Sequence, residues 1–422
     1  MRLTLAAAGT EGDVLPFLAL AHALQGAGHA VRVATHPAFQ DAVTSRGLGF
    51  APLPGDPRGA LASRASEIAA VRPWKPVAHA TTIRVGMAEL LGAATPDDHR
   101  AACADAEAVL FTLPTAYAGT VAHELGLPAI GLSATPFHRT RAFAHPVLAG
   151  GARLGPLLAP LTYPPSQKLL GEPLAEPLRR RARRAAGLPV AAWPWRAAPA
   201  WPPVPVLHTY SPALAPRPAD WPAQLRVTGH LPSPAAEGGL AAEVEAFLDA
   251  GPPPVYVGFG SMPDPDPAAT AELVVAAARA AGRRVILGSG WSGIGAGTGA
   301  ADDVLVVDHV PHDLLFPRTA GVVHHGGSGT TVAGLRAGRP TAVAPFVFDQ
   351  AFWGRCVHRA GAGPAPLPRR RLTAIRLARV LRQLGEDRVR AAADALGARM
   401  RQEAGPATAT AAVDELLAAG GR

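Results

Sequence analysis

Short apolar runs alternate with helix-like segments from the start of the chain. Leu3 to Ala8 is predicted as a buried strand, Gly9 to Asp13 as a tight loop and Val14 to Gln25 as a helix, before a second strand at His29 to Thr35. This β-loop-α-β order indicates a Rossmann-like unit and a parallel sheet. Ligands of such sheets bind beyond the carboxyl ends of the strands, so we expect Asp13 at the mouth of a crevice.

The second half of the chain repeats the pattern after a proline-rich stretch. Apolar runs at Val255–Phe259, Arg284–Leu287 and Val304–Val307 are predicted as strands, and Ala268–Ala281 as a long helix. We therefore expect an α/β protein with two such units. The expected segments are a first domain at 1–215, a proline-rich linker at 216–237, a second domain at 238–400, and a C-terminal helix at 401–422 that packs back toward the first domain.

The stretch from Gly321 to Gln350 carries the strongest chemical signal. An apolar strand ends in two histidines, and a glycine, serine and threonine loop at 325–331 then opens a helix. Free N–H groups at a helix start bind anions, and glycines let the backbone approach a phosphate closely. The acid–amide pair Asp349 and Gln350 follows the next strand and suits sugar hydroxyls. The stretch predicts a nucleotide-sugar site.

Length and composition narrow the class further. A chain of 422 residues favours two domains, and 48% hydrophobic with 17% charged residues is typical of a globular protein. No run of about 18 apolar residues predicts a membrane span. The N-terminus does not have the pattern of a signal peptide. Cys103 and Cys356 are too few to indicate a disulfide or metal framework. We expect a cytoplasmic enzyme.

The net charge of +8 raises the question of nucleic acid. The basic residues are nearly all arginine, and their clusters at 179–184 and 369–371 lack interleaved aromatic residues. Solvated helix faces explain these clusters better than a nucleic-acid site does, so no nucleic-acid partner is predicted. The loop at 9–13 lacks the GxGxxG fingerprint, which argues against NAD or FAD.

Several motifs occur together in the order that one family uses. They are GTEGDVLPFLALAHAL, HAVRVATHPAFQDAVTSRGLGFAPLPGDPR, PFHRTRAFAHP, VTGHL, GFGSM, VDHVPHDLLFPR, HHGGSGTTVAGLRAGRPT and PFVFDQ. In these motifs the chain resembles family 1 glycosyltransferases of the GT-B fold. Among them it is most similar to bacterial relatives of sterol 3β-glucosyltransferases and of antibiotic glycosyltransferases.

The resemblance implies two Rossmann-like domains whose parallel sheets face a central cleft. It also implies an inverting enzyme that moves a hexose, with glucose as first choice, from UDP-glucose or a dTDP-sugar to an apolar acceptor. That acceptor would be a sterol or other terpenoid, a polyketide or a macrolide, and a lipid acceptor would add peripheral contact with a membrane. The helix start and the loop donors would neutralise the leaving diphosphate, so no metal or other cofactor is expected. The protein is expected to be a monomer or homodimer.

Site residues follow from the resemblance position by position, together with the strand ends noted above. The donor diphosphate is assigned to His325, Gly327, Ser328, Gly329, Thr330, Ser261 and Thr10. The nucleoside is assigned to His309, Val310, His312 and Trp291, and the transferred sugar to Asp349 and Gln350. Since His309 stands where many members have a stacking tryptophan, the nucleobase preference stays open. The acceptor is assigned to His138, Arg141 and Phe143, on a loop that alternatively faces solvent.

Asp13 is predicted to be the general base. Inverting transfer needs a group that takes the proton of the acceptor hydroxyl as its oxygen attacks the anomeric carbon. Many members have histidine at this position, whereas the sterol and several antibiotic enzymes resemble this chain in having GxxGDV. An aspartate before Val14 also suits a helix N-cap, and the two roles are compatible.

Two other functions remain open from the sequence. One is a GT-B epimerase acting on a UDP-sugar, which would carry extra carboxylates in the cleft and need no acceptor. The other is a catalytically silent partner of a glycosyltransferase. Such partners tend to lose the donor loop, which is intact here at 325–330.

Overall fold

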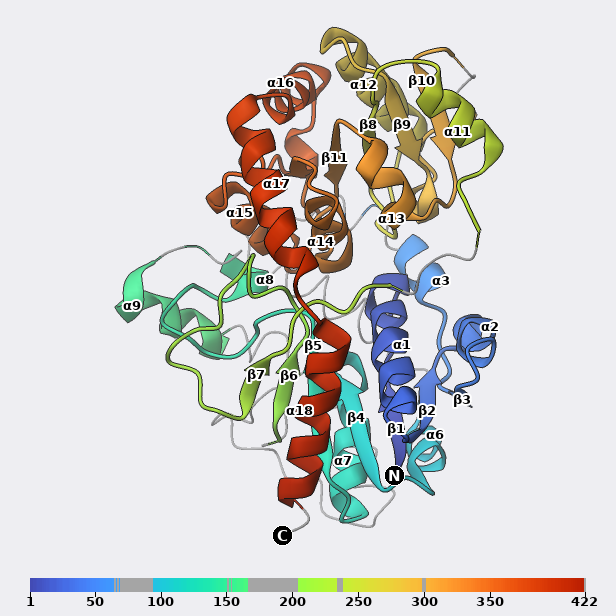
Figure 1. The fold of residues 1–422 in the computed structure, drawn as a ribbon, viewed down its shortest axis with the longest axis vertical. Coiled ribbons are helices and arrows are strands. Elements are labelled where there is room, and N and C mark those ends of the chain that lie inside the picture. The colour runs from blue at the N-terminus through green and yellow to red at the C-terminus, as the bar shows by residue number, and fades with distance from the viewer. Residues whose placement is uncertain are drawn as a thin grey trace.

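Two parallel sheets, one in each half of the chain, form the framework (Figure 1). The computed structural model describes residues 1–63, 66, 68, 94–149, 152, 154–165, 204–233, 238–297 and 301–420. The first sheet has seven strands in the order β3-β2-β1-β4-β5-β6-β7, and the second has five in the order β10-β9-β8-β11-β12. The prediction of two Rossmann-like α/β units is therefore confirmed.

The first sheet is built from short strands, of which the central ones are buried and the edge strand β3 is largely exposed. They are β1 Arg2–Ala6, β2 Ala30–Thr35, β3 Gly49–Pro52, β4 Ala108–Thr112, β5 Ala129–Ser133, β6 Val206–His208 and β7 Leu225–Val227. The α-helices of this half are α1 Glu11–Gly26, α2 Gln40–Thr44, α3 Pro57–Ala62, α6 Pro96–Cys103, α7 Ala116–Glu124, α8 Pro146–Ala149 and α9 Gly155–Leu158, with 3₁₀ turns η1 Pro37–Phe39, η2 Leu113–Thr115 and η3 Ala159–Thr162.

The second sheet has the same character. Its strands are β8 Val255–Gly258, β9 Val285–Gly288, β10 Val304–Val307, β11 Gly321–His324 and β12 Thr341–Val343. Its α-helices are α11 Ala242–Asp249, α12 Pro267–Ala280, α13 His312–Leu315, α14 Ser328–Arg336, α15 Gln350–Arg359, α16 Ala374–Leu384 and α17 Asp387–Arg401, with 3₁₀ turns η4 Gly290–Ser292, η5 Phe316–Arg318 and η6 Arg369–Arg371.

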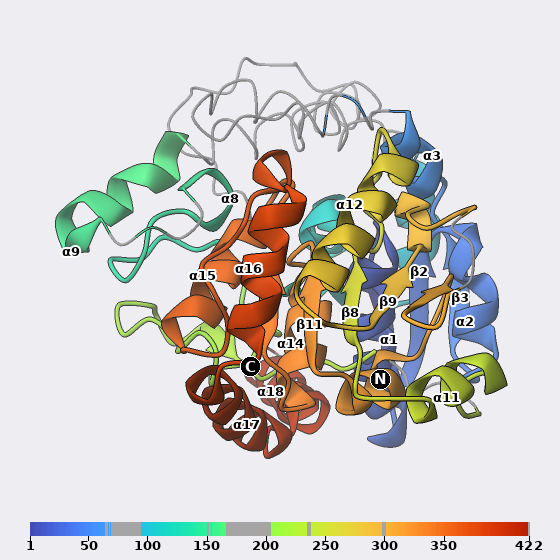
Figure 2. The same cartoon turned by 90° about the horizontal axis from the view of Figure 1, so that it is seen from above.

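Helices cover both faces of the second sheet, which explains why its strands are apolar throughout. Figure 2 shows β8 and β9 between α12 and α16 on one side and α11 on the other. Val255, Val257 and Leu287 pack with Val274 of α12 and Leu377 of α16. Alternate residues of the same strands, Tyr256 and Ile286, pack with Val244 and Leu248 of α11.

The boundary between the halves differs from the predicted linker. Residues 216–237 include β7, which pairs with β6 in parallel register and so belongs to the first sheet. The chain returns from the second half to the first at its end, where α18 Gly405–Gly420 runs beside α1 (Figure 1). Ala409, Val413 and Leu417 of α18 pack in one core with Phe17 and Leu24 of α1.

The start of α1 also differs from prediction in a way that matters for the site. The helix begins at Glu11 rather than Val14, and Thr10 is its N-cap. Asp13 therefore lies in the first turn, three residues after the cap, and not in the loop. Within the described part of the chain, no helix is both long enough and apolar enough to cross a membrane.

Candidate active site

A cavity of about 1490 Å³ lies between the two sheets. Its walls are the segments that follow the carboxyl ends of strands from both halves, including 9–13 after β1, 133–138 after β5, 308–313 after β10 and 325–330 after β11. Single-ligand pockets usually measure roughly 300–1,000 Å³. The volume is therefore sufficient for two substrates side by side.

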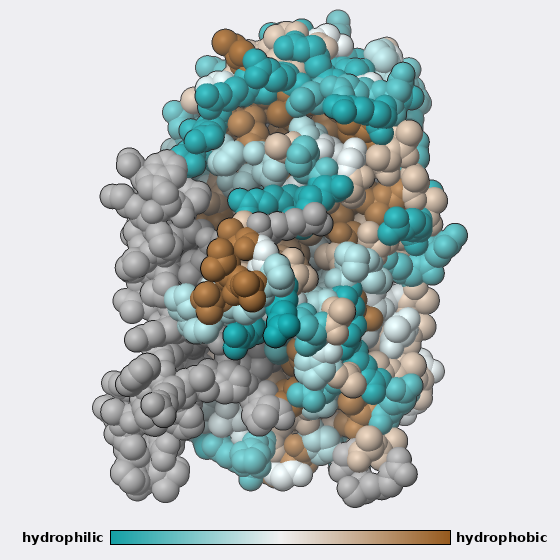
Figure 3. Space-filling view, turned by 90° about the vertical axis from the view of Figure 1, so that its left-hand side faces the viewer, coloured by the Kyte–Doolittle hydropathy of each residue, from teal (hydrophilic) through white to brown (hydrophobic). Residues whose placement is uncertain are grey.

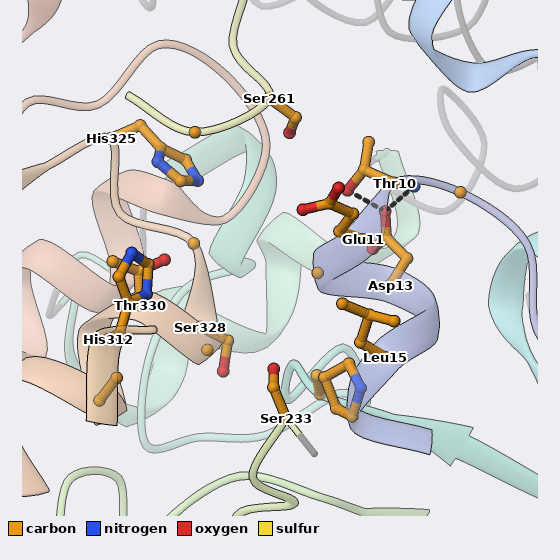
Figure 4. A pocket seen from close by; sticks show the side chains of 18 of the residues that line it. Thr10, Glu11, Asp13, Leu15, Ser233, Ser261, His312, His325, Ser328 and Thr330 are labelled. Carbon is orange, nitrogen blue, oxygen red and sulfur yellow. Dashed lines mark hydrogen bonds between the residues drawn. The ribbon is translucent and has the colours of Figure 1, made fainter. Parts of the chain in front are cut away.

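Most of the predicted site residues line this one cavity. They are Thr10, Asp13, His138, Ser261, Trp291, His309, Val310, His312, His325, Gly327, Ser328, Gly329, Thr330, Asp349 and Gln350. Residues more than three hundred positions apart are thus brought to the same place. Figure 4 shows Thr10, Glu11 and Asp13 of the first half facing Ser261, His325, Ser328 and Thr330 of the second.

The N-terminus of α14 opens onto the cavity without a side-chain cap. Its N-cap is Gly327, which has no side chain to satisfy the free N–H groups of the first turn. The hydroxyl of Ser328 and Nδ1 of His325 are also buried without a hydrogen-bond partner among the described residues. Since buried polar atoms are normally paired, these groups indicate a site for a ligand rich in acceptor oxygens.

His325 is held close to the glycine backbone around it. A Cβ atom at Gly327 would lie 2.6 Å from Nε2 of His325, so only glycine fits this approach. Burial lowers the pKa of His325 to about 4, with a smaller effect from His312. The imidazole is therefore neutral at neutral pH and offers an N–H donor rather than a positive charge.

The predicted nucleoside side combines open and buried residues. His309 is exposed, whereas Val310 is buried. The His312 ring stacks on Phe316 at 4.3 Å between centroids, and burial lowers its pKa to about 4. Trp291 makes a cation–π contact with the first half of the chain: the guanidinium of Arg58 in α3 lies 6.0 Å from its ring centroid.

Asp349 is anchored from both halves of the protein. Its Oδ2 atom accepts hydrogen bonds from the Thr135 hydroxyl of the first half and from Nε1 of Trp353, at 2.7 Å, in its own helix. Burial raises the pKa of Asp349, and these two bonds partly offset the rise.

Gln350 has a different role in the structure. Its Oε1 accepts the backbone N–H groups of Phe346 and Val347 at 2.7 and 3.0 Å, and its Nε2 lies 3.2 Å from the Met262 sulfur. The side chain thus fixes the turn before α15. One amide hydrogen is left for a ligand at most.

Asp13 presents its carboxylate to the cavity from the first turn of α1. Oδ2 accepts hydrogen bonds from the Thr10 backbone N–H at 2.8 Å and the Thr10 hydroxyl at 2.9 Å (Figure 4). The enclosing walls raise the pKa of Asp13, the Thr10 bonds offset part of this rise, and the charge of Asp349 adds to it. The side chain itself is exposed to water in the cavity, so the desolvation is partial.

The predicted acceptor residues separate into two groups. His138 lines the cavity, and its Nδ1 lies 3.1 Å from Nε2 of His208, whose ring stacks on Trp221. Phe143 does not line the cavity. It is buried against Phe352 at 5.2 Å in the core between the halves, so its assignment to the acceptor is corrected.

Arg141 is likewise not a cavity residue. Its backbone N–H donates to Asp220 at 2.7 Å, and the residue is exposed. The assignment of Arg141 to the acceptor is also corrected. Phe137, His145 and Val147 of the same region take these places in the wall.

Three residues that contribute to the site were not predicted from the sequence. Thr135 follows β5 and lies in no quoted motif, whereas Arg58, near the start of α3, ends one of the quoted motifs without having been given a role. Trp353 was within reach of sequence reasoning, since it lies one helical turn after Asp349. Within the described ranges, no three His, Cys, Asp or Glu side chains are placed to hold a metal ion.

Comparisons with known proteins agree with this arrangement. Residues 3–144 match the glycosyltransferase family 28 N-terminal domain, and residues 296–416 match the C-terminal domain of erythromycin biosynthesis protein CIII-like proteins. Sterol 3-beta-glucosyltransferase UGT80A2 of Arabidopsis thaliana is 34% identical, over 98% of this chain and 65% of its own length. UGT80B1 of the same plant is 32% identical, over 97% of this chain and 67% of its own length.

Fungal relatives are longer. The sterol 3-beta-glucosyltransferase of Neosartorya fischeri is 32% identical over 98% of this chain but only 29% of its own length. The chain thus spans about two thirds of the plant relatives and less than a third of this fungal one.

Solved structures share the fold at lower identity. The glycotransferase of kitacinnamycin has a TM-score of 0.71 at 20% identity, with 99% of each chain covered. Glycosyltransferase VinC, solved in complex with dTDP, has a TM-score of 0.64 at 21% identity, with all of each chain covered. These likenesses confirm the GT-B fold, and the identity to UGT80B1 shows that this chain belongs to the GT-B glycosyltransferase family that includes the sterol 3-beta-glucosyltransferases.

Proposed function

We propose that this protein is an inverting glycosyltransferase that moves a hexose from a nucleotide-sugar to a hydroxyl of an apolar acceptor. One observation carries the proposal. Asp13, a carboxylate with a raised pKa, faces the uncapped N-terminus of α14 across a single cavity (Figure 4). Glycosyl transfer needs a base that takes the proton of the acceptor and an anion site for the leaving diphosphate, and the two walls offer one each.

The donor diphosphate is assigned to the second wall. The free N–H groups at Ser328, Gly329 and Thr330, with the neutral imidazole of His325, would stabilise the charge that develops on the diphosphate as its bond to the sugar breaks. Gly327 permits the close approach, and Ser261 and Thr10 add hydroxyl groups at the cavity wall. These donors belong to the chain itself, so the proposal invokes no metal.

UDP-glucose is the proposed donor, with a dTDP-sugar as the next choice. The named sequence relatives are glucosyltransferases, whereas VinC was solved with dTDP. His309, Val310, His312 and Trp291 are assigned to the nucleoside. Asp349 is assigned to the sugar hydroxyls through Oδ1, because the bonds from Thr135 and Trp353 both end on Oδ2.

The reaction is a single displacement at the anomeric carbon. The acceptor oxygen attacks from the side of Asp13 as its proton passes to the Asp13 carboxylate. The bond between the anomeric carbon and the diphosphate oxygen breaks, and its electron pair leaves with the nucleoside diphosphate. Attack opposite to the leaving group inverts the configuration at this carbon.

The acceptor is assigned to the wall formed by the first half. Leu113, Phe137 and Val147 give this wall an apolar surface, and His138 supplies a polar group. Such a surface suits a sterol or other terpenoid, a polyketide or a macrolide. The names of the relatives support the first choice, and those of the fold neighbours support the others.

For a lipid acceptor, we assign the membrane contact to four leucines on α9, its N-cap and η3. Leu154, Leu157, Leu158 and Leu161 recur at helical spacing, yet they are 43, 84, 57 and 61% exposed. Figure 3 views the side of the molecule on which α9 lies, and an apolar cluster stands out there.

The position of these leucines favours a bilayer as their partner. On the opposite face of the segment, Thr162 accepts the His145 backbone N–H at 2.8 Å, and His145 lines the cavity. The leucine surface is thus the outer side of the acceptor wall. Arg139 and Arg141 are exposed on the loop between β5 and α8, which also carries His145. Their positive charges suit an anionic lipid surface.

An acceptor panel with UDP-glucose and dTDP-glucose tests the proposal, run with wild type and Asp13→Asn. We expect a glucoside of inverted configuration with at least one apolar alcohol, and loss of most activity in the variant. Release of an epimerised sugar nucleotide without an acceptor would instead support an epimerase. Failure of UDP to raise the melting temperature would support a silent accessory protein.

A further inference from the structure

The imidazole of His36 joins the ends of three neighbouring strands behind the proposed base. His36 follows β2, and its Nε2 lies 3.1 Å from the backbone nitrogen of Gly9, which follows β1. Its Nδ1 lies 3.1 Å from the carbonyl oxygen of Leu53, which follows β3. The ring is 1% exposed and is not part of the cavity wall, so it does not reach a substrate.

These two partners define the protonation of the ring. A backbone N–H can only donate, so Nε2 must accept the hydrogen bond from Gly9. Nδ1 must then carry the ring hydrogen and donate it to the carbonyl oxygen of Leu53. Burial lowers the pKa of His36, which keeps this neutral form at neutral pH. Both ring nitrogens are therefore used, and the ring holds one orientation.

Gly9 lies directly beneath the Asp13 carboxylate. Its φ of +133° is one that residues with a side chain rarely adopt, and a Cβ atom there would lie 2.5 Å from Oδ2 of Asp13. The next residue, Thr10, donates both of its hydrogen bonds to that same oxygen. The position of the Gly9 peptide thus decides where Oδ2 is held, and hence where the other carboxylate oxygen points in the cavity.

We propose that His36 is a positioning residue for the Asp13 base, acting through the hydrogen bond from Gly9. Without an acceptor at Nε2, the buried N–H of Gly9 is unpaired, and the 9–10 segment shifts to find another partner. Asp13 then loses the orientation in which it faces the acceptor hydroxyl. The inference rests on the proposed function, since it needs Asp13 to be the base.

The test compares His36→Gln with His36→Asn. Glutamine places its amide oxygen at about the reach of Nε2 and can still accept from Gly9. Asparagine reaches only to about Nδ1, so it can bond Leu53 but not Gly9. We expect kcat to fall by roughly tenfold or more in His36→Asn and clearly less in His36→Gln. The KM for the donor and the Kd for UDP should change much less than kcat, since all of the proposed donor residues except Thr10 lie on the other half. His22→Gln, an exposed position on α1, is the control.

A double variant separates positioning from a general structural effect. If His36 acts through Asp13, adding His36→Asn to Asp13→Asn costs little further activity. Multiplied losses in the double variant, or equal losses for glutamine and asparagine, would overturn the inference. So would a His36→Asn enzyme with wild-type kcat. Full activity of Asp13→Asn alone would instead refute the proposed base, which keeps the two failures distinct.

Discussion

The hydroxyl of Thr135 in the first half donates a hydrogen bond to the carboxylate of Asp349 in the second. The bond joins residues 214 positions apart and crosses between the walls of the cavity. Trp353 donates to the same oxygen, Oδ2. Asp349 is thus oriented by both halves, and this arrangement exists only when the two walls are close together.

Replacing Thr135 by valine should disrupt the orientation of Asp349. Valine keeps the shape of threonine but leaves the half-buried carboxylate with Trp353 alone. We expect kcat/KM for the donor sugar to fall by about tenfold or more, because a lost hydrogen bond to a charged group costs about 1.5–3 kcal/mol. Steady-state kinetics with varied UDP-glucose measures this. Thr135→Ser keeps the hydroxyl and should retain most activity. Equal kinetics for valine and wild type would show that the cross-wall bond has no role in donor use.

Asp13→Asn should abolish the base but not the fold. We expect kcat to fall by at least roughly 100-fold, the usual contribution of a general base. The pKa of Asp13 is raised above that of a free carboxyl, so the folded state binds this proton more tightly than the unfolded state does. Its contribution to stability is therefore greatest at acid pH and is lost as pH rises through the folded pKa. The variant should then not melt below wild type at neutral pH.

The pH profile offers an independent check of the same residue. Wild-type kcat should fall on the acid side as pH drops through the raised pKa of Asp13, since the protonated carboxyl cannot accept a proton. The residual activity of Asp13→Asn should lack this limb. An identical acid limb in both enzymes would assign it to another group and leave Asp13 without its proposed role.

The parts of the fold that depend on local pattern were predictable from the sequence. Strands such as β8 and β9 are buried on both faces and read as short apolar runs. Strand β7 was recognisable as apolar but was placed within a linker, because its membership of the first sheet is decided by pairing with β6. The first turn of α1 was missed because Thr10 and Asp13 extend the helix by side-chain bonds rather than by apolar spacing.

The residues of the site show the same distinction between features set by local sequence and features set by tertiary contacts. The geometry of the loop at 325–330, which is proposed to bind the donor, was predictable because strand, glycine loop and helix start are consecutive in the sequence. The loop after β5, which is proposed to contact the acceptor, was harder to predict, because the sequence does not show whether an aromatic side chain there faces the cavity or the core. Phe143 packs against Phe352 of the other half, and no local sequence pattern predicts this contact. Thr135 was missed for the same reason, because its partner is Asp349.

Gly327→Ala should impair the donor site by displacing His325. The added methyl would lie 2.6 Å from Nε2, so the imidazole must move away from the start of α14. We expect UDP to bind at least about tenfold more weakly, as measured by calorimetry. Gly26→Ala, where an added Cβ meets nothing within 4 Å, is the matched control and should bind UDP normally. Unchanged UDP affinity in Gly327→Ala would mean that His325 is not a donor to the diphosphate.

Ser328→Ala should separate stability from binding. The hydroxyl is buried without a partner in the described structure, so its removal should leave the melting temperature unchanged or slightly higher. UDP affinity should fall by about tenfold, because a hydrogen bond to a charged oxygen is lost. The melting temperature without UDP measures the stability, and its increase on adding UDP reports the affinity, so one thermal-melting experiment gives both. A lower melting temperature without UDP, together with normal UDP affinity, would assign Ser328 a structural role instead.

The leucines on α9 and η3 should decide whether the protein binds lipid. In water, Leu157, Leu158 and Leu161 expose more than half of their surface, and burying one leucine is worth about 1.5–3 kcal/mol. Replacing all three by serine should weaken binding to vesicles of phosphatidylcholine and phosphatidylserine by at least roughly 100-fold in a flotation assay. Transfer to a water-soluble acceptor should persist. Ile375→Ser removes an isolated residue that is 76% exposed on α16 and should bind vesicles as wild type does. If wild type does not bind vesicles and is a dimer, whereas the triple variant is a monomer, these leucines form a contact between copies of the chain.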